Sequence, residues 1–204
     1  MYNSAYINNG TCLCNNNYYQ EPFAGTCVDP CPSVPVQYYG DNSTRYCVQN
    51  CPANSFAYDD VYRCWIDCPT TSLAGNLLFR DNTTWKCVTT CSSAVPYAYT
   101  VDRNCYANCP TGTFASNATD RRCLATCPNN ANFKLWAYTN SNGIRSCVAN
   151  CPIGYWADPH TLTCVTNCSN SGYPYKDNST GANLCVTTCP GPNYFGENST
   201  YYCV

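Results

Sequence analysis

The sequence is poor in charge and almost free of histidine. Of its 204 residues, 11% are Asp, Glu, Lys or Arg, and the formal net charge is −2. A chain so weakly charged has no basic stripe for nucleic acid or for an anionic membrane surface. The single histidine, His160, lies in the turn-like segment DPHTLTC, where a solvated residue is expected. Without a second histidine no Ser/His/Asp or Cys/His set is available elsewhere, so we do not expect an enzyme, and no catalytic residue is assigned.

Long apolar runs are missing as well. The most apolar stretch, LAGNLLF, is far shorter than the ~20 residues that a membrane-spanning helix needs, so no membrane-spanning segment is predicted. The first residues, MYNSAYINNGT, contain no apolar core of a signal peptide. Because export needs a signal, we expect the numbered chain to be a mature fragment or a segment of a longer protein.

Cysteine is what the sequence has in excess, with 21 residues in 204. This density is typical of disulfide scaffolds. The hydrophobic fraction of 45% includes those 21 Cys and 19 Tyr, so the ordinary apolar core is thin and cross-links must replace burial. Disulfides persist in oxidising compartments, which predicts a secreted, extracellular or cell-surface protein.

The cysteines form an internal repeat. A Cys-x3-Cys pair occurs nine times, preceded by the shortened pair Cys12/Cys14 and followed by the half-pair Cys203. The spacing inside each pair is fixed, whereas the gaps between pairs vary from 12 to 19 residues. A fixed spacing indicates a rigid step between modules, and a variable gap indicates a loop closed by a bridge.

The spacing therefore favours bridges from each second cysteine to the next first cysteine. The favoured pairs are Cys14–Cys27, Cys31–Cys47, Cys51–Cys64, Cys68–Cys87, Cys91–Cys105, Cys109–Cys123, Cys127–Cys147, Cys151–Cys164, Cys168–Cys185 and Cys189–Cys203. This arrangement leaves Cys12 unpaired or bound to another chain. The competing arrangement closes each Cys-x3-Cys on itself; it would strand Cys203 and strain a Cys12–Cys14 ring. Sequence alone does not decide connectivity.

Each variable loop repeats an aromatic stretch, a turn-forming cluster such as GDNST, DNTT or ENST, and a short return run into Cys-Val. This pattern predicts a two-stranded β-finger. The expected fold class is small disulfide-rich β with little or no helix. We expect residues 1–11 to be a lead-in and residues 12–204 to be one continuous solenoid-like rod of ten single-disulfide modules, on the order of 100 Å long at ~10 Å per layer.

The signature Cys-Val-x-x-Cys-Pro, followed by an aromatic residue, a turn and the next Cys-Val, resembles the furin-like cysteine-rich repeats of growth-factor receptors. The low charge and the wealth of Asn and Thr also resemble the cysteine-rich surface proteins of ciliates and other protists. The resemblance covers residues 12–204 and implies small single-bridge modules, paired sequentially and stacked into a rod. Such repeats serve as receptor spacers, coats and adhesive stalks, so the resemblance is specific for architecture only.

Seven Asn-x-Ser/Thr sequons are candidate glycosylation sites. Five lie five to seven residues before a loop-closing cysteine, on the predicted finger tips: Asn42, Asn82, Asn117, Asn178 and Asn198. Asn9 has no such position, and Asn167, in NCS beside a bridged cysteine, is expected to be bare. Apart from covalent N-glycans no cofactor is expected, and the many oxidised cysteines argue against a metal site.

Most aromatic residues are expected inside the fingers. Of those that could instead face partner chains, Trp65, Trp85, Trp136 and Trp156 are the ones to examine. The longer loops 68–87 and 127–147 are candidates for an irregular binding patch.

The sequence favours a structural role, as a stiff glycoprotein rod that forms a surface coat or a filament by head-to-tail or lateral assembly. Its partners would be copies of itself or other surface glycoproteins, not nucleic acid. The alternative is a ligand-binding or adhesion ectodomain of a receptor-like surface protein, which one irregular module with an exposed apolar patch would favour. An inhibitor array has no distinctive exposed loop to support it. The broken repeat at each end indicates a cut through a longer array.

Overall fold

The structure is a computed structural model, which describes residues 4–8, 11–116, 120–130, 133–168, 172–179, 181–192, 195–197 and 199–204. Its secondary structure is all β: 24 short strands, with no helix in the ranges described. The predicted fold class of small, disulfide-linked β-hairpin modules is thereby confirmed. By packing, the chain divides into two compact units, residues 1–105 and 106–204.

The first unit begins with an antiparallel hairpin of β1 (Ser4–Asn8) and β2 (Thr11–Cys14), in the region expected to be a lead-in. Five further hairpins follow. Their strands are β3 (Tyr19–Gln20) and β4 (Cys27–Val28), β5 (Tyr39–Asp41) and β6 (Tyr46–Val48), β7 (Phe56–Tyr58) and β8 (Arg63–Trp65), β9 (Phe79–Asp81) and β10 (Lys86–Val88), and β11 (Tyr97–Tyr99) and β12 (Asn104–Tyr106).

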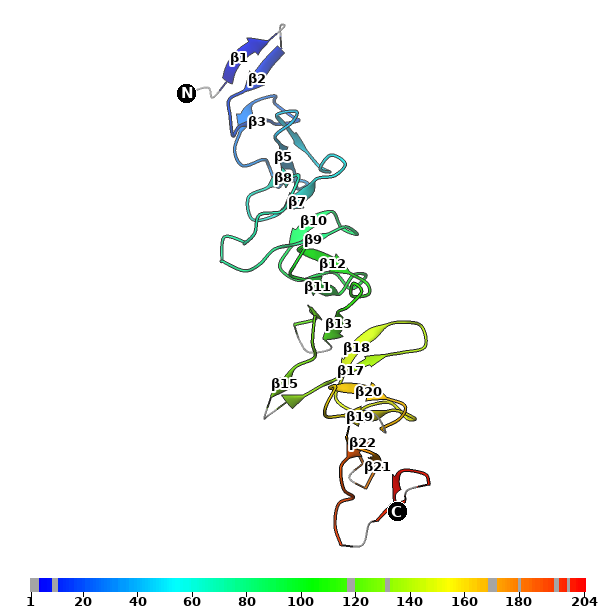
Figure 1. The fold of residues 1–204 in the computed structure, drawn as a ribbon. Helices are drawn as coiled ribbons and strands as arrows, with labels where there is room; N and C mark the ends of the chain where they lie inside the picture. The colour runs from blue at the N-terminus through cyan, green and yellow to red at the C-terminus, as the bar shows by residue number, and fades with distance from the viewer. Residues whose placement is uncertain are drawn as a thin grey trace. The chain divides into compact units, whose positions relative to one another are not determined.

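These five hairpins join into one ten-stranded sheet in the order β11-β12-β9-β10-β7-β8-β5-β6-β3-β4. One rule makes the sheet. The first strand of each hairpin pairs antiparallel with its own return strand and parallel with the return strand of the next hairpin, as in Gln20↔Tyr46 and Gly40↔Arg63. Figure 1 shows the hairpins of this unit following one another along the sheet, from β3 to β12.

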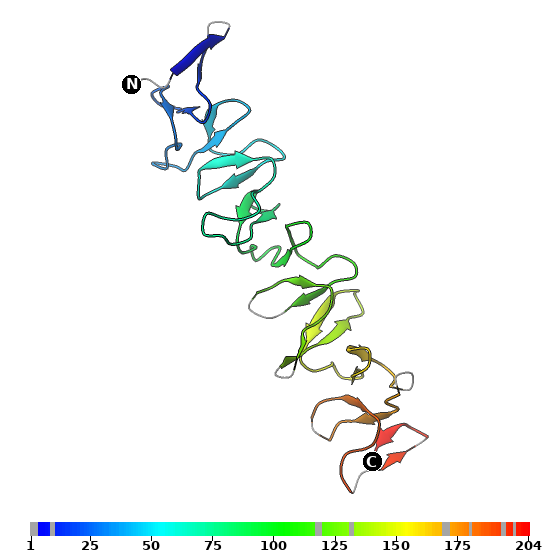
Figure 2. The same cartoon turned by 60° about the vertical axis from the view of Figure 1, so that its left-hand side comes forward.

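The second unit repeats the arrangement with its own ten-stranded sheet, in the order β14-β13-β18-β17-β20-β19-β22-β21-β24-β23. The strands are β13 (Phe114–Ser116), β14 (Cys123–Leu124), β17 (Trp136–Thr139), β18 (Arg145–Val148), β19 (Trp156–Asp158), β20 (Thr163–Val165), β21 (Tyr175–Asp177), β22 (Leu184–Val186), β23 (Gly196–Glu197) and β24 (Tyr202–Cys203). A small extra hairpin, β15 (Asn129–Asn130) with β16 (Phe133–Lys134), is inserted between β14 and β17 (Figure 2).

The array that the sequence predicts as continuous over residues 12–204 is therefore built as two sheets of five hairpins each. The break falls between the hairpin β11–β12 and the hairpin β13–β14. An isolated hairpin is marginally stable in water, and the second strand partner that each hairpin takes from its neighbour compensates for this.

Candidate functional site

The structure contains ten disulfides, each closing one hairpin loop. They are Cys14–Cys27, Cys31–Cys47, Cys51–Cys64, Cys68–Cys87, Cys91–Cys105, Cys109–Cys123, Cys127–Cys147, Cys151–Cys164, Cys168–Cys185 and Cys189–Cys203. These are the pairs that the spacing favoured, and none of the ten closes a Cys-x3-Cys on itself. The side chain of Cys12 lies outside what the structure describes.

The hydrophobic cores are small, and each belongs to the joint between two modules rather than to one finger. Tyr19, fully buried in the first module, packs with the bridge Cys31–Cys47 of the second. The same arrangement recurs at every joint for which a core cluster forms: Tyr39 with Cys51 and Cys64, Phe56 with Cys68 and Cys87, Phe79 with Cys91 and Cys105, Phe114 with Cys127 and Cys147, Trp136 with Cys151 and Cys164, and Trp156 with Cys168 and Cys185. A ring lying on the neighbour's disulfide thus takes the place of a conventional core.

A small residue makes room for that ring. Gly40 is paired with Cys47 in its own hairpin, and a Cβ atom added to Gly40 would lie 2.4 Å from Cε2 of Tyr19. In the last module of the second unit, a Cβ on Gly196 would lie 2.2 Å from the ring of Tyr175. Alanine occupies the corresponding position in several other hairpins, for example Ala57, Ala137 and Ala157, each opposite a bridged cysteine.

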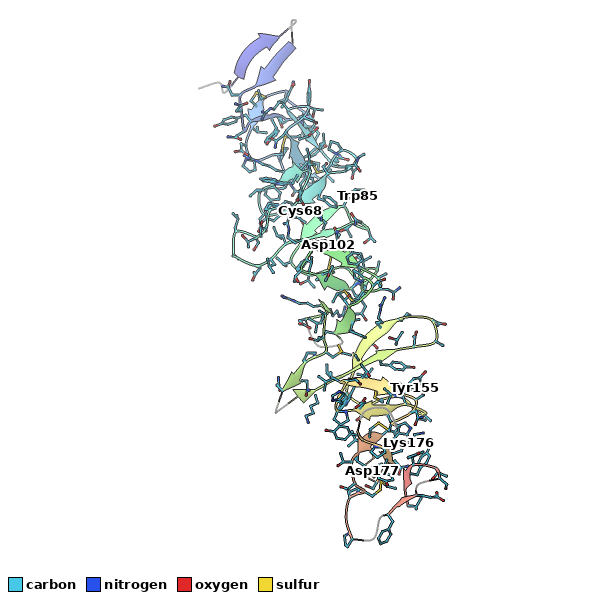
Figure 3. The ribbon with its side chains drawn as sticks, viewed as in Figure 1. Cys68, Trp85, Asp102, Tyr155, Lys176 and Asp177 are labelled. Carbon is cyan, nitrogen blue, oxygen red and sulfur yellow. A yellow bond between two sulfur atoms is a disulfide. The ribbon has the colours of Figure 1, made fainter. Side chains whose placement is uncertain are left out.

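Lysine takes this position once. Lys176, on β21 and labelled in Figure 3, is paired with Cys185. Its Nζ lies 5.9 Å from the centroid of the Trp156 ring and 5.2 Å from that of the Tyr202 ring. A cation over two aromatic faces is a favourable arrangement. Arg80, paired with Cys87, also has this position, but its guanidinium contacts the carbonyl of Asp102 and the carboxylate of Asp67. The joints are therefore filled in different ways, by a small residue under the ring or by a long cation.

Backbone hydrogen bonds tie the modules together through a residue in the left-handed conformation. Tyr62 (φ 52°) stands two positions before its loop-closing cysteine, and its carbonyl accepts a bond from the amide of Gly40 in the preceding module at 2.8 Å. The others with positive φ whose carbonyls do the same are Arg45, Trp85, Arg103, Leu162 and Tyr201. This conformation is uncommon for residues with a side chain, so the surrounding structure must hold it.

In several hairpins a carboxylate at the first position orders the turn. Asp41, Asp81, Asp158 and Asp177 are buried, and each accepts a bond from the backbone amide two residues on. Burial alone would raise the pKa of Asp81, but hydrogen bonds from Thr83 and Ser92 outweigh it and hold the pKa at about 2, below the ordinary 3.8. The pKa of Asp41 is lowered for the same reason, since hydrogen bonds from its turn outweigh its burial. These are turn-forming carboxylates, not an acid–base pair.

Side chains add further ties between modules. The hydroxyl of Tyr39 donates to Oδ1 of Asp59 at 2.6 Å, and Nζ of Lys86 lies 2.9 Å from Oδ2 of the same carboxylate. Asp59 thus connects three consecutive modules. Arg103 of the fifth module ties it to the start of the fourth. Its guanidinium donates to the carbonyls of Cys68 and Pro69 at 2.7 and 2.9 Å and pairs with Asp67 at 3.1 Å.

The sequons that can be placed are all exposed. Asn42, Asn82 and Asn178 lie at the turn of a hairpin, directly after a buried aspartate, as the finger-tip prediction requires. Asn167 is also exposed, although it lies in the step beside Cys168. The remaining sequon residues, Asn9, Asn117 and Asn198, lie outside the described residues.

The described residues of the first unit line several grooves, of which three are relevant to the sequons and tryptophans. The first, about 430 Å³, runs between the turn of the second module and the return strand of the third, and Asn42, Pro52, Trp65 and Ile66 are among its lining residues. The second, about 280 Å³, occupies the same place one module later. The third, about 490 Å³, includes Trp85.

The tryptophans divide into two groups. Trp136 and Trp156 are buried at 8% and 6% exposure and serve the joints, whereas Trp65 and Trp85 are 36% and 48% exposed. Only the latter two are available to a partner. The ring of Trp85 also lies 5.6 Å from that of Phe56, centroid to centroid.

The two longer loops hold small irregular insertions. In loop 68–87 a single bridge pairs Thr71 with Leu77, and Leu73 is 77% exposed. Loop 127–147 contains the hairpin β15–β16. His160 is exposed in the turn after β19, and its backbone amide donates to Asp158.

The packing of a ring on the disulfide of the neighbouring module was not predicted from the sequence. The signal was present as an aromatic residue followed by a small one and then by Asp or Tyr, as in YGD, FAY and WAD. This triplet differs from an ordinary strand pattern because its middle residue is set by the neighbouring module.

The chain matches no protein-family model, and neither the curated proteins nor the solved structures contain a match to it. The fold supports its description as an array of cysteine-rich repeats. Ten disulfides also indicate an oxidising compartment. Within the described ranges no helix has the length and apolarity to cross a membrane. In the same ranges no three His, Cys, Asp or Glu side chains come together as a metal site would require.

Proposed function

We propose that the chain is the stiff structural part of a secreted or surface glycoprotein of the furin-like repeat type. In this role it would form a coat or a filament by head-to-tail or lateral assembly. The observation that carries the proposal is the coupling at the joints. Within each sheet, a module gives its neighbour a ring on the disulfide and strand hydrogen bonds, so bending a sheet would open several contacts at once.

Rigidity of this kind suits a spacer or a filament. Neighbouring strands lie ~4.8 Å apart, so each ten-stranded sheet extends for about 50 Å. The rod of ten modules that the repeat predicts has a length on the order of 100 Å. Repeating contacts between such rods do not close into a ring and therefore produce filaments or sheets.

Electron microscopy of the chain secreted from a eukaryotic host tests this proposal. The expected result is regular filaments or lateral arrays as the concentration is raised, with sugar on the exposed turns. Isolated particles at every concentration would contradict the assembly role. Mass spectrometry of the same material reports the glycans separately, so the two parts of the proposal are tested independently.

One observation favours the second candidate, an adhesion or ligand-binding ectodomain. Loop 68–87 departs from the repeat and exposes Leu73 and Leu77, at 77% and 37%. An adhesive role predicts that serine at both positions abolishes attachment of the secreted chain to its cell surface. Unchanged attachment of this double variant would remove the support for that candidate.

A further inference from the structure

The first groove has a property that its counterpart one module later lacks. A sequon asparagine, Asn42, lines it together with an exposed tryptophan, Trp65, and Ile66, which is 85% exposed. In all but a few modules the residue after the loop-closing cysteine is valine, as in Val48 and Val88. Trp65 is therefore an exception that the joint between modules does not require.

The second groove provides the internal comparison. Asp59 occupies the place of Asn42, because both follow the last residue of a first strand and both accept a hydrogen bond from the tyrosine of the preceding module at 2.6 Å. Val88 takes the place of Trp65, and the groove shrinks from about 430 to about 280 Å³. Of these two equivalent grooves, the one with the sequon is therefore the wider one and the one with the indole.

The asparagine is already oriented for a substituent. The buried hydroxyl of Tyr19 donates to Oδ1 of Asn42 at 2.6 Å, which fixes the carboxamide and leaves Nδ2, the atom that carries an N-glycan, for the sugar. In the folded turn Thr44, the sequon hydroxyl, donates to Oδ2 of Asp41 at 2.7 Å. The sequon hydroxyl is thus engaged in the fold, so attachment has to come before the turn closes.

We propose that the N-linked glycan on Asn42 folds back into this groove, with its first sugars on the indole of Trp65 and against Ile66. Attachment forms the bond from Nδ2 to the anomeric carbon of the sugar. It breaks the bond from that carbon to the pyrophosphate of a lipid-linked donor and releases the amide proton. The electron-rich face of the indole then attracts the polarised C–H groups of the sugar, and the aliphatic side chain covers its apolar side.

This inference rests on the glycoprotein part of the proposed function. Its consequence is that the sugar becomes part of the joint between the second and third modules. Asn178 offers a contrast, because it lies in an equivalent Asp-Asn-Ser turn but is followed in the next module by Val204 and not by an aromatic residue.

The test is carbon–proton NMR of the whole chain, secreted with isotope-labelled glycans. The C–H protons of the first sugar on Asn42 are expected to shift upfield by the ring current of Trp65, while those on Asn178 stay at the positions of a free glycan. Trp65→Val, which installs the residue common at this position, removes the upfield shift, and Trp65→Phe retains part of it. Trimming the glycan to its first sugar leaves the shift in place.

The outcomes distinguish whether Asn42 carries a glycan from whether that glycan lies in the groove. If mass spectrometry finds Asn42 without sugar, the glycoprotein proposal fails at this residue and the groove proposal fails with it. If Asn42 is glycosylated but its signals match those on Asn178, or survive Trp65→Val unchanged, the groove proposal alone is overturned. The Trp65→Phe variant guards against a folding defect, since it keeps an aromatic ring in the same place.

Discussion

Gly40→Ala is the most informative single change, because two physical effects predict opposite signs. Gly40 lies on β5 outside the left-handed region, where alanine normally stabilises a protein by about 0.4–1 kcal/mol through the unfolded chain. The added Cβ, however, would lie 2.4–2.6 Å from three ring atoms of Tyr19. Tyr19 is fully buried and its hydroxyl is bonded to Asn42, so the ring has no free space into which to move.

Overpacking of this kind costs about 1–3 kcal/mol. From the middle of each range, about 2 kcal/mol less about 0.7 kcal/mol, the net effect is a loss of roughly 1.3 kcal/mol, confined to the joint between the first two modules. Hydrogen exchange measures it at the amide of Gln20, which bonds to the carbonyl of Arg45 across that joint. Exchange there should become roughly 9-fold faster.

The control amide is Ala137, which makes the corresponding bond to Leu162 in the second unit and should be unaffected. Tyr19→Leu supplies the matched background. With the ring gone, Gly40→Ala should lose its destabilising effect or become mildly stabilising. Slower or unchanged exchange at Gln20 in the single variant would refute the claim that the ring and the small residue are coupled.

Three further predictions follow from the turns and bridges. Because folding lowers the pKa of Asp81 to about 2, its carboxylate stabilises the folded state by about 2 kcal/mol above pH ~4, and this stabilisation is lost between pH ~4 and ~2. The melting temperature should fall over that pH range, and in Asp81→Asn it should change less with pH there. Replacing Cys151 and Cys164 by alanine opens a loop with sequence separation 13 and should cost about 3 kcal/mol in chemical denaturation, with the first unit's transition unchanged. Arg103→Met removes charged hydrogen bonds and should cost about 2 kcal/mol in the same assay; no loss would show that these bonds are dispensable.

Sequence reasoning reached the fold because cysteine spacing is a strong constraint. A fixed step of three residues and a variable loop admit few pairings, and turn residues such as those around Asp41 mark the fingertip directly. The hairpin and its bridge are local, so their signals are local as well.

The joints were harder to predict because they are not local. That Gly40 must be small depends on Tyr19, more than a module away in the chain, and the left-handed conformation of Tyr62 serves a bond to Gly40. A sequence read one module at a time assigns each aromatic residue to its own finger. The division into two sheets has no marker in the cysteine pattern either, since the spacing around Cys105 and Cys109 is the same as elsewhere.

Small-angle X-ray scattering of the secreted chain, after enzymatic removal of its sugars, tests the central claim of a stiff rod most directly. The rod on the order of 100 Å that the repeat predicts would have a radius of gyration of about 30 Å. A compact protein of 204 residues would give about 17 Å. A value near 30 Å that does not change with salt supports the rod, and a value of about 17–20 Å would contradict it.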